Sequence, residues 1–214
     1  KNKQHRSGLK RLVRRHSRPM LLYLAQVYTD ASVVFGMNAW DSPLEPILIC
    51  SEWAKRNGYD FFLKLHPKEI NGACPVTGQR YRNLTLTKAL EHPHLKKRIT
   101  SKGAMVDVYN QYDTSSLIAS ADVVATLNSQ AGLEAAIFGK PVVTFGDAFY
   151  SDLGFTIQSG SYNHSAKQLD LAAQKEKTGD ALEFAYFLYE IFCIEKNMVS
   201  LNSLIDGQLK NNVF

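Results

Sequence analysis

Apolar runs and helix-like patterns alternate along the first part of the chain. Residues 18–27 form an apolar run typical of a strand buried in a parallel sheet, and residues 59–67 form a second one. Between them, residues 43–58 place apolar side chains at helical spacing, with a capping serine before the segment and a glycine at its end. This order predicts a strand–helix–strand unit in which residues 28–42 are a connecting loop.

The rest of the chain continues the alternation with shorter elements. Residues 70–96 are polar and broken by Gly and Pro, which predicts a long loop or insertion with one short helix around 85–91. The remaining patterns predict strands within 98–105 and at 122–128 and 141–146, and helices in the second half of 107–121 and at 129–140, 166–177 and 179–196.

Strands that alternate with helices predict an α/β fold, a Rossmann-like parallel sheet with helices on both faces. We expect three parts along the chain. Residues 1–18 are a basic N-terminal segment, residues 19–160 are the Rossmann-like domain with its 70–96 insertion, and residues 161–214 are helices that pack on this domain or cross back from it.

The composition is typical of a folded globular protein. Hydrophobic residues make up 45% of the chain, which is enough for a sizeable core. No apolar run approaches the roughly 20 residues that span a bilayer, and no signal-peptide pattern is present. The three cysteines lie far apart, which favours reduced thiols in the cytoplasm over a disulfide framework or a zinc site. Because the first residue is Lys1 rather than Met, we expect a fragment or a processed chain.

The positive charge is concentrated at the start of the chain. Residues 1–18 hold eight Lys or Arg and no acid, within a net charge of +5. A solvated helix leading into the domain explains this segment, and so does a basic face for anionic lipid headgroups or another polyanion. A nucleic-acid partner is not expected, because no aromatic-interleaved motif or recognition helix accompanies the charge.

Polar side chains follow three of the predicted strands. Ligands of open parallel sheets bind outside the carboxyl ends of the strands, so these positions are candidates for a site. They are residues 26–30 after the first strand, Lys64, His66, Pro67 and Lys68 at the end of the second, and Asn128, Ser129 and Gly132 after the strand at 122–128. The lysines and the imidazole are donors that indicate an anion.

The turn from strand to helix at residues 128–132 is the most informative of the three. Backbone N–H groups at a helix start, a hydroxyl and a glycine that permits close approach together form an anion-binding arrangement. Ser129 is also explained as a simple N-cap. Glu134, on the first turns of this helix, either complements the helix dipole or accepts hydrogen bonds from the ribose of a nucleotide.

Three stretches carry a family resemblance: "QVYTD", "LKLHPKE" and "SADVVATLNSQAGLEAAIFGKPVVTFGDAFYSDLGFT". With them the chain resembles the bacterial capsule-polysaccharide biosynthesis proteins that act as retaining β-Kdo transferases, and more broadly the CMP-sugar-using glycosyltransferases of GT-B architecture. The resemblance covers about residues 25–157. Residues 128–150 are its most specific part, whereas the His-Pro dipeptide alone is weak and occurs again at residues 92–93.

The resemblance implies roles for the residues at the second strand end. His66 would donate a hydrogen bond to the phosphate of CMP and assist the departure of the nucleotide, and Pro67 would fix the exit of the strand. Lys64 and Lys68 would balance the charge of the phosphate or of the sugar carboxylate. Lys68 is equally explained as a solvated surface charge.

The resemblance also implies a nucleotide cradle after the later strand. Asn128, Ser129 and backbone groups around Gln130 and Gly132 would complete the phosphate site, and Glu134 would bind the ribose.

A retaining mechanism by double displacement requires a carboxylate nucleophile, and the resemblance points to Asp30 for this role. An Asp that caps or turns the loop is the alternative, and Asp41 in the same loop is a rival. Phe149 or Tyr150 would lie near the base or the sugar, although core packing explains these aromatics equally well.

The resemblance implies a glycosyltransferase that transfers Kdo or a related acidic sugar from a CMP-activated donor to a glycan or glycolipid acceptor, in capsule or lipopolysaccharide-like synthesis at the cytoplasmic membrane face. No metal cofactor is expected, since no DxD cluster is present. The chain matches the donor-binding half, so an acceptor-binding domain is expected upstream.

Two other functions stay open. One is a UDP-sugar-dependent GT-B or epimerase-like enzyme, and the other is a non-catalytic nucleotide-binding domain of a glycan-export assembly.

Overall fold

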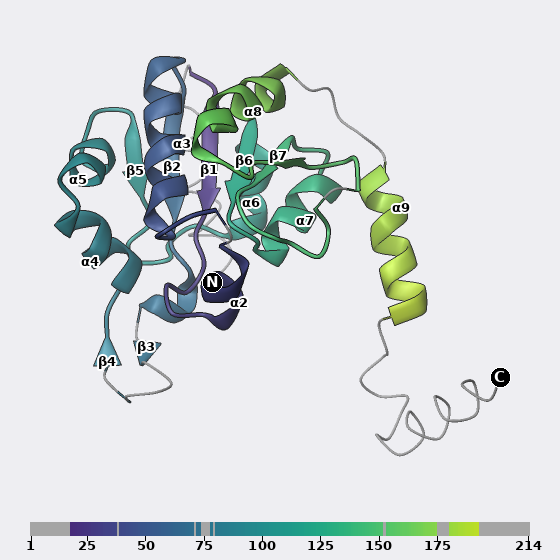
Figure 1. Ribbon diagram of the computed structural model, residues 1–214, viewed down its shortest axis with the longest axis horizontal. Helices are drawn as coiled ribbons and strands as arrows, with labels where there is room; N and C mark the ends of the chain where they lie inside the picture. The colour runs from purple at the N-terminus through teal and green to yellow at the C-terminus, as the bar shows by residue number, and fades with distance from the viewer. Residues whose placement is uncertain are drawn as a thin grey trace.

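The computed structural model describes residues 18–37, 39–70, 72–73, 78, 80–151, 153–174 and 180–192. Within these ranges a six-stranded sheet forms the centre of the molecule, and every neighbouring pair of strands is parallel (Figure 1). In spatial order its strands are β5 (Ala104–Val106), β2 (Asp60–Lys64), β1 (Met20–Leu24), β6 (Val123–Thr126), β7 (Val142–Thr144) and β8 (Ile157–Gln158). The predicted α/β fold with a parallel sheet is confirmed.

The strand β1 lies inside the sheet and is buried along its whole length. Leu21 and Tyr23 contribute to the core on one face, whereas Leu22 and Leu24 contribute to the core on the other. Successive side chains of a strand point to opposite faces, so a strand covered on both faces is apolar at every position. This explains why the sequence shows a continuous apolar run here.

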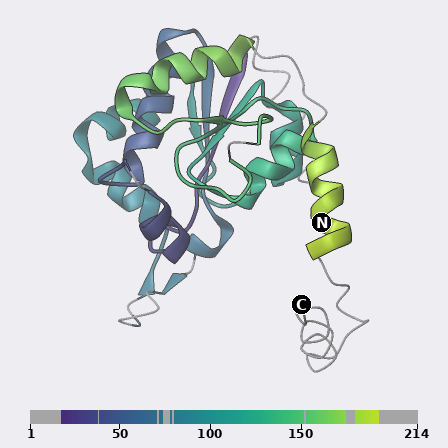
Figure 2. The same cartoon turned by 45° about the vertical axis from the view of Figure 1, so that its right-hand side comes forward.

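Helices cover both faces of the sheet (Figures 1 and 2). One face packs against α3 (Leu44–Arg56), α4 (Leu84–Glu91), α5 (Pro93–Ile99) and α8 (Tyr162–Gln174). The other packs against α6 (Thr114–Ser120), α7 (Gln130–Ile137) and α9 (Asp180–Phe187), which continues into the π-helical turn η2 (Leu188–Phe192). Of the predicted C-terminal helices, α8 contacts α3 and α9 contacts α7, and residues 193–214 lie outside the described residues.

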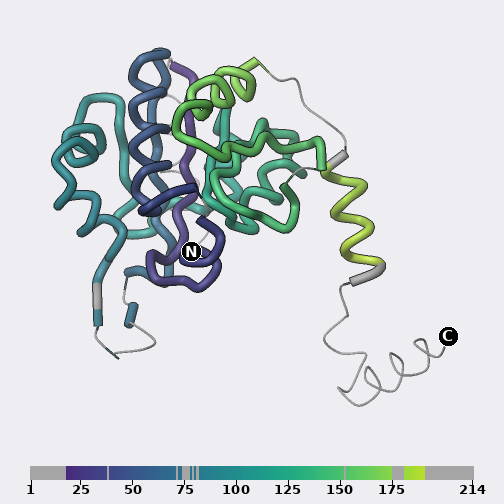
Figure 3. The backbone as a smooth tube through the Cα atoms, in the orientation of Figure 1, coloured from purple at the N-terminus to yellow at the C-terminus, as the bar shows by residue number. Residues whose placement is uncertain are grey.

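The order of the strands places a switch point between β1 and β6. The chain runs outward from β1 through β2 to β5, returns to β6 on the other side of β1, and continues to β7 and β8 (Figure 3). The connections after β1 and β6 therefore leave in opposite directions at the carboxyl edge of the sheet, which is the usual position of a ligand in such folds.

The loop predicted for residues 28–42 is wrong in part, because it contains the short helix α2 (Ala31–Gly36). Asp30 caps this helix, as its carboxylate accepts a hydrogen bond from the N–H of Ser32. Six residues are too few to show a helical period in the sequence, so only the cap could have indicated the helix.

The segment 70–96 contains more structure than predicted. The expected short helix is confirmed as α4, and it is preceded by the antiparallel pair β3 (Gly72–Ala73) and β4 (Arg80–Tyr81). The helix α5 was not predicted. Its first residue is Pro93, and the side chain of His92 caps it by accepting from the N–H of Leu95. The second His-Pro dipeptide is therefore a helix start, a position that proline favours.

The basic N-terminal segment falls almost entirely outside the described residues, which begin at Arg18. Across the part of the chain that the structure describes, no helix combines the length and the apolar character that crossing a membrane requires.

Candidate functional site

The loops that follow β1 and β6 are joined by hydrogen bonds at the switch point. The backbone N–H of Asn128 donates to the side-chain oxygen of Gln26 at 3.0 Å, and the Asn128 side chain donates to the carbonyl of Ser32 at 2.7 Å. Gln26 in turn donates to the hydroxyl of Ser32. Asn128 therefore holds the start of α2, and with it Asp30, against the end of β6.

Two glycines allow the loops after β1 and β7 to approach each other. A Cβ atom on Gly36 would lie 2.2 Å from the side-chain nitrogen Nδ2 of Asn128. A Cβ atom on Gly146 would lie 2.3 Å from the backbone carbonyl oxygen of Gly36. The indole N–H of Trp40 also donates to the carbonyl of Phe145, at the end of β7. The sequence alone indicates no role for Gly36, Trp40 or Gly146, because the residues that they contact are distant in the sequence.

Asp30 projects from the loop after β1 and is exposed. Its carboxylate accepts hydrogen bonds from the N–H of Ser32 at 2.9 Å and from the hydroxyl of Ser32 at 2.8 Å. These bonds are the main cause that lowers the pKa of Asp30; burial opposes them, and the charges of His66 and Lys68 lower the pKa by smaller amounts. The carboxylate is therefore ionised at neutral pH.

His66 follows β2 and caps the 3₁₀ turn η1 (Pro67–Glu69). Its Nδ1 accepts a hydrogen bond from the backbone N–H of Lys68 at 3.2 Å, so the neutral ring carries its proton on Nε2. Burial is the main cause that lowers the pKa of His66; the charge of Lys68 adds to this effect, and the charges of Glu69 and Asp30 oppose it. The ring is thus a neutral N–H donor, half-buried beside the exposed Pro67 and Lys68.

Glu69, the last residue of η1, is completely buried although it carries a charge. It accepts a hydrogen bond from the N–H of Tyr28 at 2.7 Å, and two more from the N–H and the hydroxyl of Thr85 at 3.0 and 2.9 Å. A buried carboxylate with three donors is well compensated. Glu69 joins the loops after β1 and β2 to the start of α4, and nothing in the sequence pattern had identified it.

Lys64 lies apart from these groups because the protein itself occupies its ammonium. Its Nζ is 2.7 Å from a carboxylate oxygen of Asp107, both side chains are buried, and Asn110 is a further partner. Asp107 also accepts from the N–H groups of Gln111 and Tyr112. This ion pair accounts for the charge of Lys64 without a ligand.

The candidate residues on and before α7 differ in how far they are buried. Ser129 is half-buried and caps the helix, as its hydroxyl accepts from the N–H of Ala131 at 3.3 Å. Gln130 and Glu134 are exposed on the surface of the helix. Gly132 is buried against Tyr150, whose hydroxyl would lie 2.2 Å from an added Cβ atom. This glycine makes room for a protein side chain.

The two aromatics after β7 have different environments. Tyr150 is completely buried, and its hydroxyl donates to the carbonyl of Ser129. Burial raises its pKa, and the residue belongs to the core, as the packing alternative had it. Phe149 is exposed and packs edge-on against Tyr150.

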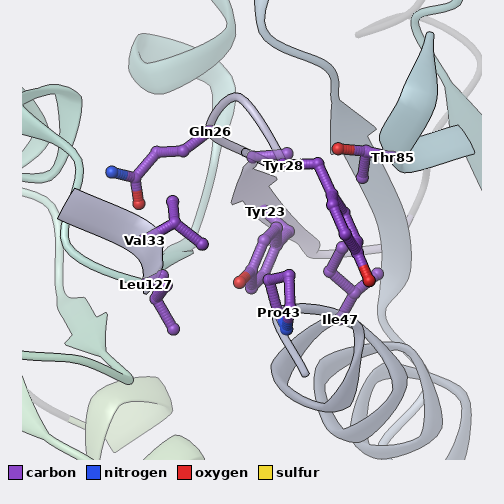
Figure 4. A pocket seen from close by; sticks show the side chains of 9 residues that line it. Tyr23, Gln26, Tyr28, Val33, Pro43, Ile47, Thr85 and Leu127 are labelled. Carbon is purple, nitrogen blue, oxygen red and sulfur yellow. The ribbon is translucent and has the colours of Figure 1, made fainter. Parts of the chain in front are cut away.

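A small cavity lies at the same carboxyl edge, beside the ends of β1 and β6 (Figure 4). Its lining carries no charged side chain and consists of Tyr23, Ala25, Gln26, Tyr28, Val33, Pro43, Ile47, Thr85 and Leu127. Tyr28 and Thr85 are the residues that Glu69 holds, so its buried carboxylate fixes one wall of the cavity. Such a surface suits an uncharged ring better than a phosphate.

Across the described ranges, no three His, Cys, Asp or Glu side chains gather as they would around a metal ion. The charged and donor groups of the site are instead Asp30, His66, Lys68 and the start of α7. Asp30, His66 and Lys68 follow β1 and β2, and the start of α7 follows β6, so all of them lie at the carboxyl edge of the sheet beside the switch point.

A family model described as "Capsule polysaccharide biosynthesis protein" matches residues 2–192 of the chain. Among curated proteins, Protein FixF of Sinorhizobium fredii is 39% identical over 64 residues, which are 28% of this chain and 16% of that protein.

Two solved structures resemble the fold. The first is "KpsC, beta Kdo 2,4 transferase" of Thermosulfurimonas dismutans, with a TM-score of 0.51 and 19% identity over 86% of this chain and 53% of that one. The second is the UDP-GlcNAc 2-epimerase of Methanocaldococcus jannaschii, with a TM-score of 0.55 and 13% identity over 86% of this chain and 50% of that one. The chain thus spans about half the length of these structures, and at such identities they support the α/β fold alone.

Proposed function

The chain belongs to the capsule polysaccharide biosynthesis protein family, and from this premise we propose that it is the donor-binding part of a glycosyltransferase that makes a bacterial surface polysaccharide. The proposed donor is CMP-Kdo or a CMP-activated relative, and the proposed acceptor is a glycan or glycolipid. Family membership supports a role in surface polysaccharide synthesis, and the donor is proposed because the family resemblance of the sequence implies it.

The observation that carries the proposal is that the loop bearing Asp30 and the turn bearing His66 are joined at the ends of β1 and β2, through the hydrogen bond from the N–H of Tyr28 to Glu69. An ionised carboxylate beside a neutral N–H donor suits a double displacement. Asp30 would attack the anomeric carbon while the bond to the CMP oxygen breaks, and Nε2–H of His66 would donate to the departing phosphate. An acceptor hydroxyl would then displace Asp30, lose its proton to solvent and restore the original configuration at that carbon.

The other groups have supporting roles in this proposal. The hydroxyl of Ser129 and the N–H groups at the start of α7 would bind the phosphate, with Asn128 and Gln130 beside it and Gly132 keeping α7 close to Tyr150. Glu134, exposed on α7, would take the ribose hydroxyls. Lys68 would offset the negative charge of the donor, and Pro67 would hold the turn.

The reaction as proposed includes no metal, because hydrogen-bond donors meet the charge that develops on the leaving phosphate. The acceptor would bind on a second domain, outside this chain. We also propose that the protein works at the cytoplasmic face of the membrane, with residues 1–18 toward anionic headgroups.

A UDP-sugar-dependent enzyme is the second candidate, because the same α/β fold occurs in an enzyme that acts on a UDP-sugar. Calorimetry with CMP, UDP and GDP separates the two, because the first predicts that CMP binds most tightly. Tight binding of UDP without binding of CMP would overturn the proposed donor.

Transfer itself is tested with a protein that includes the regions flanking this chain, incubated with CMP-Kdo and a Kdo-bearing acceptor. His66→Ala should abolish most of the product, whereas His94→Ala, which changes an exposed histidine of α5, should leave it unchanged. Binding of the donor with no product from the wild-type protein would instead favour a non-catalytic nucleotide-binding domain.

A further inference from the structure

A second hollow lies at the opposite edge of the sheet from the candidate site. Phe61 and Ala104 line it near the amino ends of β2 and β5. Lys55 reaches it from the last turn of α3, and Arg98 from the last turn of α5. Because the carboxyl and amino edges are opposite ends of a parallel sheet, this hollow is separate from the proposed nucleotide site.

The lining of this hollow is strongly basic. Arg18, Lys55, Arg98 and Lys102 contribute to it, and no lining residue is acidic. Among the described residues, none of these four forms an ion pair with a carboxylate. Four like charges around one hollow repel one another, so an anion that binds between them relieves this cost.

Two carboxylates lie close to this hollow: Asp60 is buried beneath the turn at Gly103, and Asp122 is near enough to Tyr59, a lining residue, for its charge to act on it. The Oδ1 atom of Asp60 would lie 3.1 Å from a Cβ atom on Gly103, and Asp60 is not part of the lining. Gly103 has φ +88° in a turn closed by a hydrogen bond from the N–H of Ala104 to the carbonyl of Ser101. This turn presents Lys102 to the hollow, and neither Asp60 nor Asp122 belongs to the lining.

Basic residues in the last turn of a helix also stabilise the helix dipole, which is an alternative reason for their presence. In α5 that purpose is already served by Lys96 and Lys97, which lie in the same last turn but do not line the hollow. Arg98 therefore stands out by its position, and it is half-buried where its two neighbours are exposed.

We propose that this hollow, formed by Arg18, Lys55, Arg98 and Lys102, is a binding site for a phosphate group. The planar fork of an arginine suits two phosphate oxygens, and the lysines add charge. The group belongs either to a small phosphate in solution or to the headgroup of an anionic lipid.

The test uses the whole chain and two matched double variants. Arg98→Gln/Lys102→Gln removes two charges from the hollow, and Lys96→Gln/Lys97→Gln removes two charges from the neighbouring surface. Each protein is titrated with inorganic phosphate and with pyrophosphate by calorimetry. Each is also sedimented with phosphatidylglycerol–phosphatidylcholine vesicles and with pure phosphatidylcholine vesicles, after thermal unfolding shows that it is folded.

The first variant should weaken binding of the anionic ligand about 25-fold, since each basic residue contributes about fivefold at such a surface. The control pair should weaken it much less, and CMP affinity should stay unchanged in both. Binding of phosphate or pyrophosphate identifies a soluble ligand, and binding of anionic vesicles alone identifies the lipid headgroup. Equal losses in the two variants would show diffuse surface charge and would overturn the site, as would a wild-type chain that binds neither.

Discussion

The buried carboxylate of Glu69 lies 2.7 Å from the backbone nitrogen of Tyr28, whose N–H donates to it. This bond joins the turn that carries His66 to the loop that carries Asp30, although the two segments are 41 residues apart. Because the same carboxylate also binds Thr85, one side chain sets the relative position of the loops after β1 and β2. The proposed chemistry depends on this spacing.

Glu69→Gln should therefore destabilise the fold and weaken the site. The glutamine keeps one acceptor but turns an amide N–H₂ toward a backbone or hydroxyl donor, and an unsatisfied buried group costs about 1–3 kcal/mol. Urea unfolding should show this loss, and CMP affinity should fall even where the protein is fully folded. Glu91→Gln, which changes an exposed carboxylate paired with Lys88, is the control and should shift stability by less than about 0.5 kcal/mol. Equal effects of the two substitutions would contradict the role of Glu69.

The imidazole of His66 should titrate below 6.5, its ordinary pKa, because burial and Lys68 disfavour the charged ring. Following the ring signals by NMR against pH measures this directly. CMP should raise the pKa again, since a phosphate beside the ring favours its protonated form. A free-protein pKa above 6.5, or no change when CMP binds, would argue against the proposed contact.

The same shift predicts a pH dependence of stability. With a lowered pKa in the folded state, the unfolded chain binds more protons just below pH 6.5, so unfolding free energy rises with pH through this window. The contribution of His66 is complete above the unfolded pKa and is lost as pH falls through the folded pKa. His66→Asn, which keeps a capping acceptor, should flatten this part of the stability profile relative to the wild type.

Asp30 is both a helix cap and the proposed nucleophile. Asp113 is a helix cap without a proposed catalytic role, so a comparison of the two residues separates the two effects. Asp113 caps α6 in the same manner, accepting from the N–H and the hydroxyl of Ser116 at 2.9 and 2.8 Å. Replacing either Asp by Ala should cost about 1 kcal/mol of stability through loss of the cap. Replacing either by Asn should cost little stability, yet only Asp30→Asn should stop sugar transfer by the protein that includes the flanking regions. Transfer by Asp30→Asn at the wild-type rate would remove Asp30 from the mechanism.

Gly132→Ala should destabilise the protein, although alanine is the better helix former by about 1 kcal/mol. The added methyl group would overlap the hydroxyl of Tyr150, and overpacking of this kind costs about 1–3 kcal/mol. Tyr150→Phe removes the obstructing oxygen, so the double variant should lose less than the sum of the two single ones. A double-mutant cycle by urea unfolding measures this coupling, and additive losses would show that the methyl group fits elsewhere.

Lys64→Met should cost about 3–5 kcal/mol, because it leaves the carboxylate of Asp107 buried and unpaired. Adding Asp107→Asn should recover part of that loss, and urea unfolding compares the two variants. CMP affinity, measured on folded protein, should be the same as in the wild type. A selective loss of CMP affinity would return Lys64 to the phosphate site that the family resemblance implied for it.

The sequence was sufficient to predict the parallel sheet and the edge of the sheet at which the candidate site lies. Strands such as β1 and β2 are buried on both faces, so each appears in the sequence as a continuous apolar run. Because ligands of parallel sheets bind at the carboxyl ends of the strands, the residues that follow β1, β2 and β6 are then expected at the same edge. The helix α2 escaped prediction because one turn and a half shows no period. Caps are local features and were easier to anticipate, as the alternatives considered for Asp30 and Ser129 show.

The contacts that shape the site could not be predicted in the same way. Glu69 looks like a surface acid in a polar turn, and only its distant donors make it a buried one. Gln26 and Asn128 are 102 residues apart, and Gly36 is needed because Asn128 lies against it. A lysine at the end of a strand, such as Lys64, is typical of a ligand-binding residue. Its partner Asp107 follows a different strand, and no spacing in the sequence relates the two.

Trp40 and Trp53 are the two tryptophans of the chain, and they lie in different places. The indole of Trp40 touches the end of β7 at the carboxyl edge, with its ring 5.7 Å from that of Phe145, whereas the indole of Trp53 donates to Asp170 of α8 at 2.7 Å. Replacing Trp53 by Phe would leave Trp40 as the single tryptophan of the chain, beside the loops of the proposed donor site. Its emission would then give an optical readout of nucleotide binding with no label attached to the protein.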